Sequence, residues 1–154
     1  MKRDNSQKTS ILIVDDEEVV RLSHARVLSN PWCRVETAGN GAEALRALER
    51  ESFDVVLLDL RMPEMGGLEV LRLIKERWPE SEVVIITGYA SIDTAKEAVR
   101  LGAYDYLAKP LDPDQVITAT HGAVRQKRWT MHLEPPDTVA RSGTSRPEAR
   151  LLSN

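Results

Sequence analysis

Three acidic residues stand directly after apolar runs, where strands of a parallel sheet would end. Asp15 and Asp16 follow the run over residues 11–14, and Asp59 follows the run over residues 55–58. Short, continuously apolar runs are typical of strands that helices cover on both faces. Because the carboxyl ends of parallel strands open into the crevice where ligands bind, we expect the three carboxylates to share one small site. Their oxygens suit a hard cation such as Mg²⁺ or Mn²⁺.

Two residues of different chemistry stand at the ends of other predicted strands. Thr87 carries a small hydroxyl that can donate a hydrogen bond, and Lys109 carries a mobile positive charge suited to a phosphate oxygen. Like charges a few ångströms apart raise each other's pKa, and a bound divalent ion reverses that tendency. The pattern predicts a cradle for an anion beside a metal ion, with a carboxylate nucleophile at its centre.

The elements that must position these residues alternate along the chain. Five apolar segments predict strands, over residues 11–15, 34–38, 54–59, 82–87 and 104–108. Helical patterns lie between them, with Asn40 as an expected N-cap, Pro79 as a stop, Gly102 as a C-terminal glycine and residues 112–113 as the start of a fifth helix. This alternation predicts an α/β fold built on a parallel sheet with right-handed crossovers.

Composition is typical of an ordinary globular domain. The chain has 154 residues, 42% of them hydrophobic, and a net charge of −3 that gives no support to a nucleic-acid-binding surface. Cys33 is the only cysteine, so no internal disulfide is possible, and no apolar run has the length of a signal peptide or a membrane span. We expect a cytoplasmic domain over residues 10–128, a flexible N-terminus over residues 1–9, and a flexible tail or truncated linker over residues 129–154.

Four strings of residues together resemble a known family. They are Val14-Asp15-Asp16-Glu17, Asp59-Leu60-Arg61-Met62-Pro63, Thr87-Gly88 and Lys109-Pro110. In this order and at these strand ends, they resemble the receiver domain of two-component response regulators, over residues 10–128. Residues 86–107 look most similar to the receivers of nitrogen-regulator-type transcription activators. The resemblance implies a flavodoxin-like, doubly wound (βα)5 sheet of strand order 2-1-3-4-5.

The resemblance also implies roles for the acids and the lysine. Asp59 would accept a phosphoryl group from a sensor histidine kinase or a phosphotransfer protein. Mg²⁺ would be held by Asp16, Asp59 and the backbone carbonyl of Arg61, with Asp15 acting through water. Lys109 would contact the phosphoryl group. The protein would then be no enzyme beyond catalysing its own phosphorylation and dephosphorylation.

A conformational switch is implied as well. Thr87 would turn toward the phosphoryl group, and Tyr106 would move with it from an exposed to a buried position. The bond between Lys109 and Pro110 is expected to be cis, which is plausible only because proline follows. The surface of the fourth helix, fifth strand and fifth helix would shift its population of states to control an output domain or partner. That surface could also support a homodimer, and we expect no membrane contact and no direct nucleic-acid binding by the receiver.

The sequence departs from the family pattern in one loop, and it carries bulky residues at two positions that affect phosphoryl lifetime in the family. Gly66 stands where many relatives carry an acid, which is expected to loosen the turn and spare the site. Arg61 and Tyr89 lie two residues beyond Asp59 and Thr87, at positions that tune the lifetime of the phosphoryl group in the family. Both side chains are bulky and could shield phosphorus from in-line water. We therefore expect slow self-dephosphorylation.

Two other functions fit part of the pattern. A Mg²⁺-dependent phosphohydrolase with an aspartyl nucleophile would place nucleophile and acid on one strand as Asp-x-Asp, whereas Asp59 stands on a different strand from the acidic pair. A pseudo-receiver would bind a partner without phosphorylation, although all the reactive residues are present here. No ATPase or helix-turn-helix module follows in this sequence, so a stand-alone receiver and a fragment of a longer regulator are both open.

Overall fold

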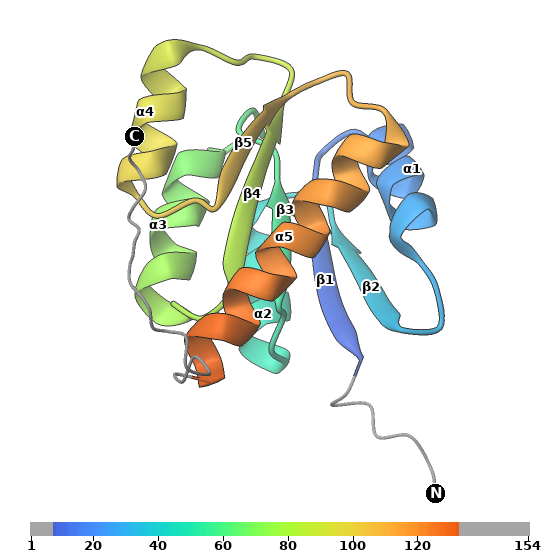
Figure 1. Cartoon of the computed structure of the whole chain (residues 1–154). Coiled ribbons are helices and arrows are strands. Elements are labelled where there is room, and N and C mark those ends of the chain that lie inside the picture. The colour runs from blue at the N-terminus through green and yellow to red at the C-terminus, as the bar shows by residue number, and fades with distance from the viewer. Residues whose placement is uncertain (1–7, 133–154) are drawn as a thin grey trace, which may run out of the picture.

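The computed structural model describes residues 8–132, which form a parallel sheet covered by helices on both faces (Figure 1). In chain order the elements are β1 (Thr9–Val14), α1 (Glu18–Leu28), β2 (Cys33–Ala38), α2 (Gly41–Arg50), β3 (Val55–Leu58), α3 (Gly67–Arg77), β4 (Glu82–Thr87), α4 (Ile92–Arg100), β5 (Asp105–Ala108) and α5 (Pro113–His132). The predicted alternation of strands and helices is therefore confirmed. None of the helices within residues 8–132 is long and apolar enough to cross a membrane.

The sheet has the order β2-β1-β3-β4-β5, and each neighbouring pair is parallel. This confirms the flavodoxin-like order, in which the chain starts beside one edge, adds that edge strand and then returns to build the sheet to the other edge. In the register of the neighbouring strands β1 and β3, Val14 lies opposite Leu58. Asp15 and Asp59 therefore follow at the same level of neighbouring strands, which brings residues far apart in the sequence to one edge.

Side chains of the central strands alternate between two hydrophobic cores. Leu12, Val56 and Ile85 belong to the core shared with α2, α3 and α4. Ile13, Leu57 and Val84 belong to the core on the opposite face, under α1 and α5, and Figure 1 shows α5 lying across the strands on that face. Each of these side chains contributes about 1.5–3 kcal/mol by leaving water. Burial on both faces explains why the strands read as continuous apolar runs.

The predicted helix ends have the expected chemistry. The Asn40 side chain accepts a hydrogen bond from the Glu43 N–H at 2.8 Å, which caps α2. Asp112 and Gln115 exchange two bonds of 3.0 Å at the start of α5, a reciprocal capping box. Gly102 follows α4 with a φ of 101°, in the left-handed region that glycine adopts without a steric penalty. The two caps mark where the loops after β2 and β5 end and their helices begin, and Gly102 marks the end of α4.

Several element bounds differ from the predicted ones. Strand β3 ends at Leu58, so Asp59 stands just beyond it, and β1 begins already at Thr9, inside the expected flexible N-terminus. Helix α5 continues to His132 although its apolar stripe fades near residue 128, because each residue added to an existing helix gains a hydrogen bond without a new nucleation cost. The remainder of the expected flexible ends, residues 1–7 and 133–154, lies outside the described residues.

Candidate functional site

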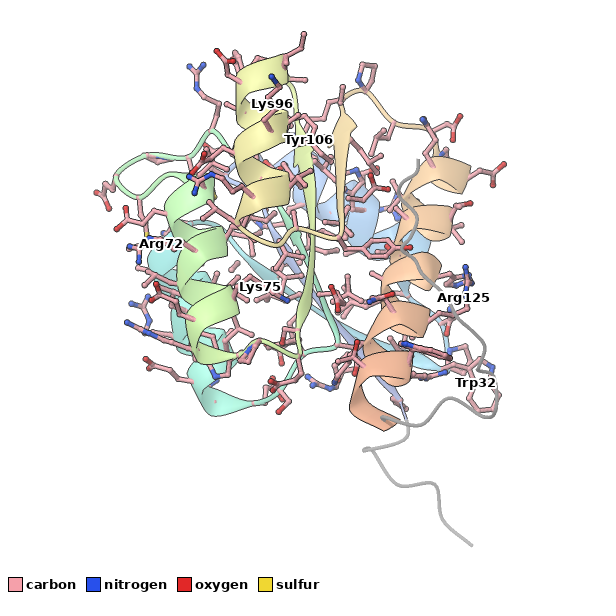
Figure 2. All side chains as sticks on the ribbon, turned by 60° about the vertical axis from the view of Figure 1, so that its left-hand side comes forward. Trp32, Arg72, Lys75, Lys96, Tyr106 and Arg125 are labelled. Carbon is pink, nitrogen blue, oxygen red and sulfur yellow. The ribbon has the colours of Figure 1, made fainter. Side chains whose placement is uncertain are left out.

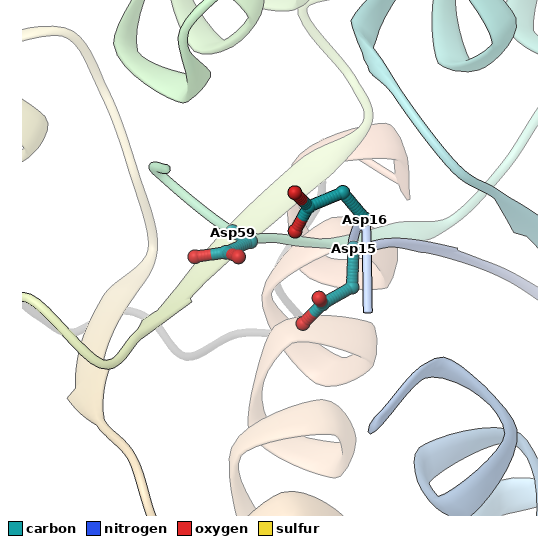
Figure 3. A group of neighbouring side chains, drawn as sticks. All are labelled: Asp15, Asp16 and Asp59. Carbon is teal, nitrogen blue, oxygen red and sulfur yellow. The ribbon is translucent and has the colours of Figure 1, made fainter. Parts of the chain in front are cut away.

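Three carboxylates gather at the carboxyl edge of the central strands (Figure 3). Asp15 and Asp16 follow β1 and Asp59 follows β3, and one oxygen from each lies within 4.8 Å of the others. Asp15 and Asp59 are buried, with 3% and 5% of their surface exposed, whereas Asp16 is exposed. The structure thus brings together the three acids that the sequence places at strand ends.

Lys109, which follows β5, reaches into this acidic cluster. Its Nζ lies 2.8 Å from Asp15 Oδ2, 3.6 Å from Asp59 Oδ2 and 3.5 Å from Glu17 Oε1. Burial alone would lower the pKa of Lys109, but the hydrogen bond to Asp15 and the charges of the surrounding acids outweigh it and raise the pKa. The lysine therefore stays charged at neutral pH. The peptide bond from Lys109 to Pro110 is cis.

The two buried acids differ in how well their oxygens are satisfied. Asp15 accepts hydrogen bonds from the Glu17 N–H at 2.9 Å and from Lys109 at 2.8 Å. Among the residues that the structure describes, Asp59 accepts only a longer bond, from the Arg61 N–H at 3.3 Å. Burial raises the pKa of Asp59, and Asp15 and Asp16 raise it further, while Lys109 and the Arg61 N–H oppose them. Asp59 is thus a poorly solvated carboxylate with lone pairs left for another partner.

A cleft of about 620 Å³ opens over these groups. Its lining consists of Asp16, Glu17, Asp59, Arg61, Met62, Pro63, Gly88, Tyr89 and Lys109. The Arg61 guanidinium carbon lies 3.8 Å from the centroid of the Tyr89 ring, a cation–π contact. This contact joins the loop after β3 to the loop after β4, so both side chains lie together at the cleft.

The two expected switch residues lie apart from the cleft lining. Thr87 is fully buried, and its hydroxyl oxygen accepts a hydrogen bond from the Tyr89 N–H at 3.1 Å. The Tyr106 hydroxyl accepts from the Ser91 N–H at 3.2 Å and contacts the Thr94 hydroxyl at 2.5 Å. Tyr106 is thus tied to the first turn of α4, and Figure 2 shows it beside that helix. Neither residue belongs to the lining of the cleft.

Two residues that shape the site were not predicted from the sequence. Glu17 lines the cleft and contacts Lys109, and its position directly after the acidic pair could have indicated this. Gly67 begins α3, where an added Cβ would lie 2.3 Å from the Asp59 carbonyl oxygen and 2.6 Å from Leu60 Cα. Helix α3 therefore packs directly on the backbone of Asp59, which only glycine permits.

The loop after Asp59 has its left-handed residue at Glu64 and not at a glycine. Glu64 has a φ of 70°, whereas Gly66 has an ordinary φ of −72° as the N-cap of α3. A Cβ on Gly66 would approach only the Leu60 carbonyl oxygen, at 3.9 Å. A side chain at position 66 would therefore fit, and the structure shows no steric need for glycine there.

The donor set fits a hard divalent cation. The acidic cluster offers carboxylate oxygens alone, from Asp15, Asp16 and Asp59. Oxygen ligands on an open, partly hydrated site are what Mg²⁺ prefers, because it keeps several of its own waters. The exposed Asp16 and the poorly satisfied Asp59 have free lone pairs for this purpose, and Arg61, whose backbone carbonyl is the expected further ligand, lines the same cleft.

Comparison with known proteins gives a consistent result. Residues 11–121 match the family model of the response regulator receiver domain. The chain is 44% identical over 116 residues to the transcriptional regulatory protein ZraR of Klebsiella oxytoca, covering 73% of this chain and 25% of that protein. It is 39% identical over 137 residues to the DNA-binding transcriptional regulator NtrC of Escherichia coli K12, covering 86% of this chain and 29% of that protein.

Solved structures agree with the sequence relatives. A CheY-like receiver domain protein from Methanospirillum hungatei JF-1 has a TM-score of 0.77 at 28% identity and covers 80% of this chain and 98% of that one. NtrX from Brucella abortus has a TM-score of 0.76 at 34% identity and covers 81% of this chain and 29% of that one. The chain spans 25–32% of the length of the first-listed regulators that it matches.

Proposed function

We propose that this chain, which belongs to the response regulator receiver domain family, accepts a phosphoryl group on Asp59 from a phosphohistidine of a sensor kinase or phosphotransfer protein. Membership of the family implies phosphorylation-switched signalling. One observation supports the assignment to Asp59 above the others. Its carboxylate is buried and, within residues 8–132, accepts only one long hydrogen bond, yet it lines an open cleft beside a lysine.

The transfer requires little from the protein beyond positioning and charge. A carboxylate oxygen of Asp59 would bond to phosphorus while the phosphorus–nitrogen bond of the phosphohistidine breaks, and the electron pair of that bond stays on the imidazole. Lys109, whose Nζ lies 3.6 Å from Asp59 Oδ2, is placed to neutralise charge on a phosphoryl oxygen. The product is an aspartyl phosphate, a mixed anhydride that water can hydrolyse.

We assign Mg²⁺ to the same acids. Asp16, Asp59 and the Arg61 backbone carbonyl would hold it directly. Asp15 would act through water, which suits a carboxylate that already accepts hydrogen bonds from Glu17 and Lys109. When bound, the ion supplies positive charge that offsets the charge of the phosphoryl oxygens and orients them.

The switch would run through Thr87 and Tyr106. The Thr87 hydroxyl accepts from the Tyr89 N–H and still has its own O–H to donate, so it would have to move toward the cleft, whose lining does not include it, to contact a phosphoryl oxygen. Movement of Tyr106 must break its contacts with Ser91 and Thr94 in the first turn of α4. A change at the cleft would thereby alter the surface of α4, β5 and α5, which we assign to an output domain, a partner or a homodimer. The matched regulators are named for transcription, so we propose a transcriptional output.

The stacked pair over the cleft supports a long-lived phosphoryl group. Arg61 and Tyr89 both line the cleft and contact one another, so together they can exclude in-line water. Replacing either by alanine should shorten the half-life of the aspartyl phosphate, and replacing both should shorten it most. A half-life unchanged in the double variant would contradict the shield.

Phosphorylation itself is tested by intact mass. The protein is incubated with Mg²⁺ and a small acyl phosphate, and a single phosphoryl adduct is expected. Asp59→Asn should abolish the adduct, whereas Asp54→Asn, at the opposite end of β3, should retain it. Catalytic turnover of diverse phosphate esters would instead favour a phosphohydrolase, and a protein inert to acyl phosphate would favour a pseudo-receiver.

A further inference from the structure

Arg21, in α1, holds the backbone of the acidic pair. Its Nη1 donates to the Asp15 carbonyl oxygen at 2.7 Å. The other polar groups of Asp15 have partners elsewhere, because its N–H donates to the Ala38 carbonyl at 3.1 Å and its carboxylate accepts from Glu17 and Lys109. The peptide that leads from Asp15 to Asp16 is therefore fixed through its carbonyl by a charged donor, one of the stronger kinds of hydrogen bond.

The Asp16 side chain, in contrast, is not fixed by a hydrogen bond within residues 8–132. The side chain is exposed, and within residues 8–132 its carboxylate accepts no hydrogen bond. One of its oxygens nevertheless lies within 4.8 Å of oxygens of Asp15 and Asp59. The direction of this carboxylate therefore depends on the backbone that carries it, and that backbone includes the peptide bonded to Arg21.

The guanidinium of Arg21 occupies a defined place between β1 and the turn after β2. A Cβ added to Gly39 in that turn would lie 3.5 Å from Arg21 Nη1 and 3.6 Å from Glu43 Oε1. The same Glu43 oxygen accepts the Gly39 N–H at 2.8 Å. The guanidinium thus lies beside this turn as well as at the Asp15 carbonyl.

We propose that Arg21 is a positioning residue for the divalent cation, holding the Asp15–Asp16 peptide so that Asp16 faces Asp59. The inference rests on the proposed function, which assigns the cation to these acids. Groups that orient metal ligands without touching the metal commonly change its affinity when they are removed. A mere charge effect has the opposite sign, because removing a nearby positive charge would strengthen the binding of a dication.

Calorimetric titration of the whole chain with Mg²⁺ separates these effects. Arg21→Ala should weaken Mg²⁺ binding by about 10-fold or more, the usual effect of losing an orienting partner. Arg21→Lys should recover part of the affinity, since an ammonium can also donate to a carbonyl. Arg26→Ala is the matched control, because Arg26 is an exposed arginine in the last turn of the same helix, and its loss should leave the affinity unchanged.

A second measurement distinguishes positioning from general support of the fold. The rate of adduct formation with acyl phosphate is followed as Mg²⁺ is raised, on variants that unfold cooperatively in urea. Arg21→Ala should need more Mg²⁺ but approach the wild-type maximal rate, and Arg21→Lys gives the same comparison if the alanine variant does not fold. Affinity equal to or tighter than that of the wild type in Arg21→Ala overturns the inference alone. Absence of Mg²⁺ binding by the wild type overturns the metal assignment and the inference together.

Discussion

Strand β3 carries an aspartate just beyond each end, and each aspartate faces a lysine. Before the strand, Asp54 accepts the Lys127 ammonium at 2.6 Å and the Ser10 N–H at 2.8 Å. After the strand, Asp59 lies 3.6 Å from Lys109 and accepts one backbone N–H at 3.3 Å. The same residue types thus form a direct, hydrogen-bonded ion pair at one edge of the sheet, which we call the closed pair. At the other edge they form a longer contact that leaves carboxylate oxygens available.

The difference arises from how many acids share each lysine. Lys127 forms an ion pair with Asp54, whereas Lys109 lies within 3.6 Å of Asp15, Glu17 and Asp59. One ammonium cannot neutralise several carboxylates, so the carboxyl edge keeps excess negative charge and incompletely satisfied oxygens. A satisfied pair stabilises the fold, while an unsatisfied cluster attracts a cation and leaves a nucleophile available.

The largest contrast should come from removing each lysine. Lys109→Ala should slow adduct formation with acyl phosphate by about 100-fold, because a preorganised charge beside the phosphoryl group is lost. Lys127→Ala, at the closed pair, should leave that rate unchanged in the folded protein. Intact mass spectrometry over time measures both. Equal slowing in the two variants would contradict the distinction between the two ends of β3.

The closed pair should matter instead for stability. Asp54→Ala leaves the mostly buried Lys127 ammonium and the Ser10 N–H without their partner. The free energy of unfolding should fall by about 2–3 kcal/mol, since unpaired groups keep their desolvation cost. Urea denaturation measures the loss. A variant as stable as the wild type would show that the Asp54–Lys127 pair does not stabilise the fold.

Asp59→Asn should raise the free energy of unfolding at neutral pH without divalent ions, whereas Asp54→Ala lowers it. Because burial raises the pKa of Asp59, the folded protein binds the proton of this carboxyl more tightly than the unfolded chain does. The protonated carboxyl therefore favours folding below the unfolded pKa of about 3.9, and this stabilisation is lost as the pH rises through the folded pKa. The neutral amide avoids that loss, and we expect a gain on the order of 0.5–1 kcal/mol.

The gain of Asp59→Asn should vanish in acid, where the wild-type carboxyl is protonated in both states. It should reverse with saturating Mg²⁺, which stabilises the wild type by binding its folded state. Urea titrations of both proteins at neutral and acidic pH, with and without Mg²⁺, test the sign. A variant less stable than the wild type at neutral pH without metal would contradict the proposed cost of charging Asp59.

The smallest effect should come from Glu17→Gln. Glu17 lies 3.5 Å from Lys109, but its side chain is 65% exposed and water screens the pair. The free energy of unfolding should change by less than about 0.5 kcal/mol, as for other exposed ion pairs. Urea denaturation checks this. A large loss would mean that Glu17 belongs to the structural core of the cluster rather than to its rim.

Much of the architecture could be predicted from local signals. The apolar runs predicted every strand, the predicted bounds of β4 match, and the caps at Asn40 and residues 112–113 predicted helix starts. The acids at strand ends predicted the clustering seen at the carboxyl edge. These features depend on neighbours in sequence or on the shared edge of parallel strands, both of which a pattern can encode.

Other features depend on contacts between distant residues. Asp54 and Asp59 flank the same apolar run, and only the fold shows that Lys127, 73 residues further on, closes the pair with Asp54. Two hydrogen bonds, between the Thr94 and Tyr106 hydroxyls and from Arg21 to the Asp15 carbonyl, likewise form only in the packed structure. The last turn of α5 was missed because it persists without an apolar stripe to indicate it.

The close approach of α3 to the backbone of Asp59 has a consequence for reading mutational scans. Position 67 has no side chain, yet any substitution must push α3 away from the Asp59 carbonyl oxygen. A library screened for signalling output would therefore score this glycine as intolerant as the acids themselves. Only a parallel readout of cellular abundance would separate a residue that does chemistry from one that merely leaves space for it.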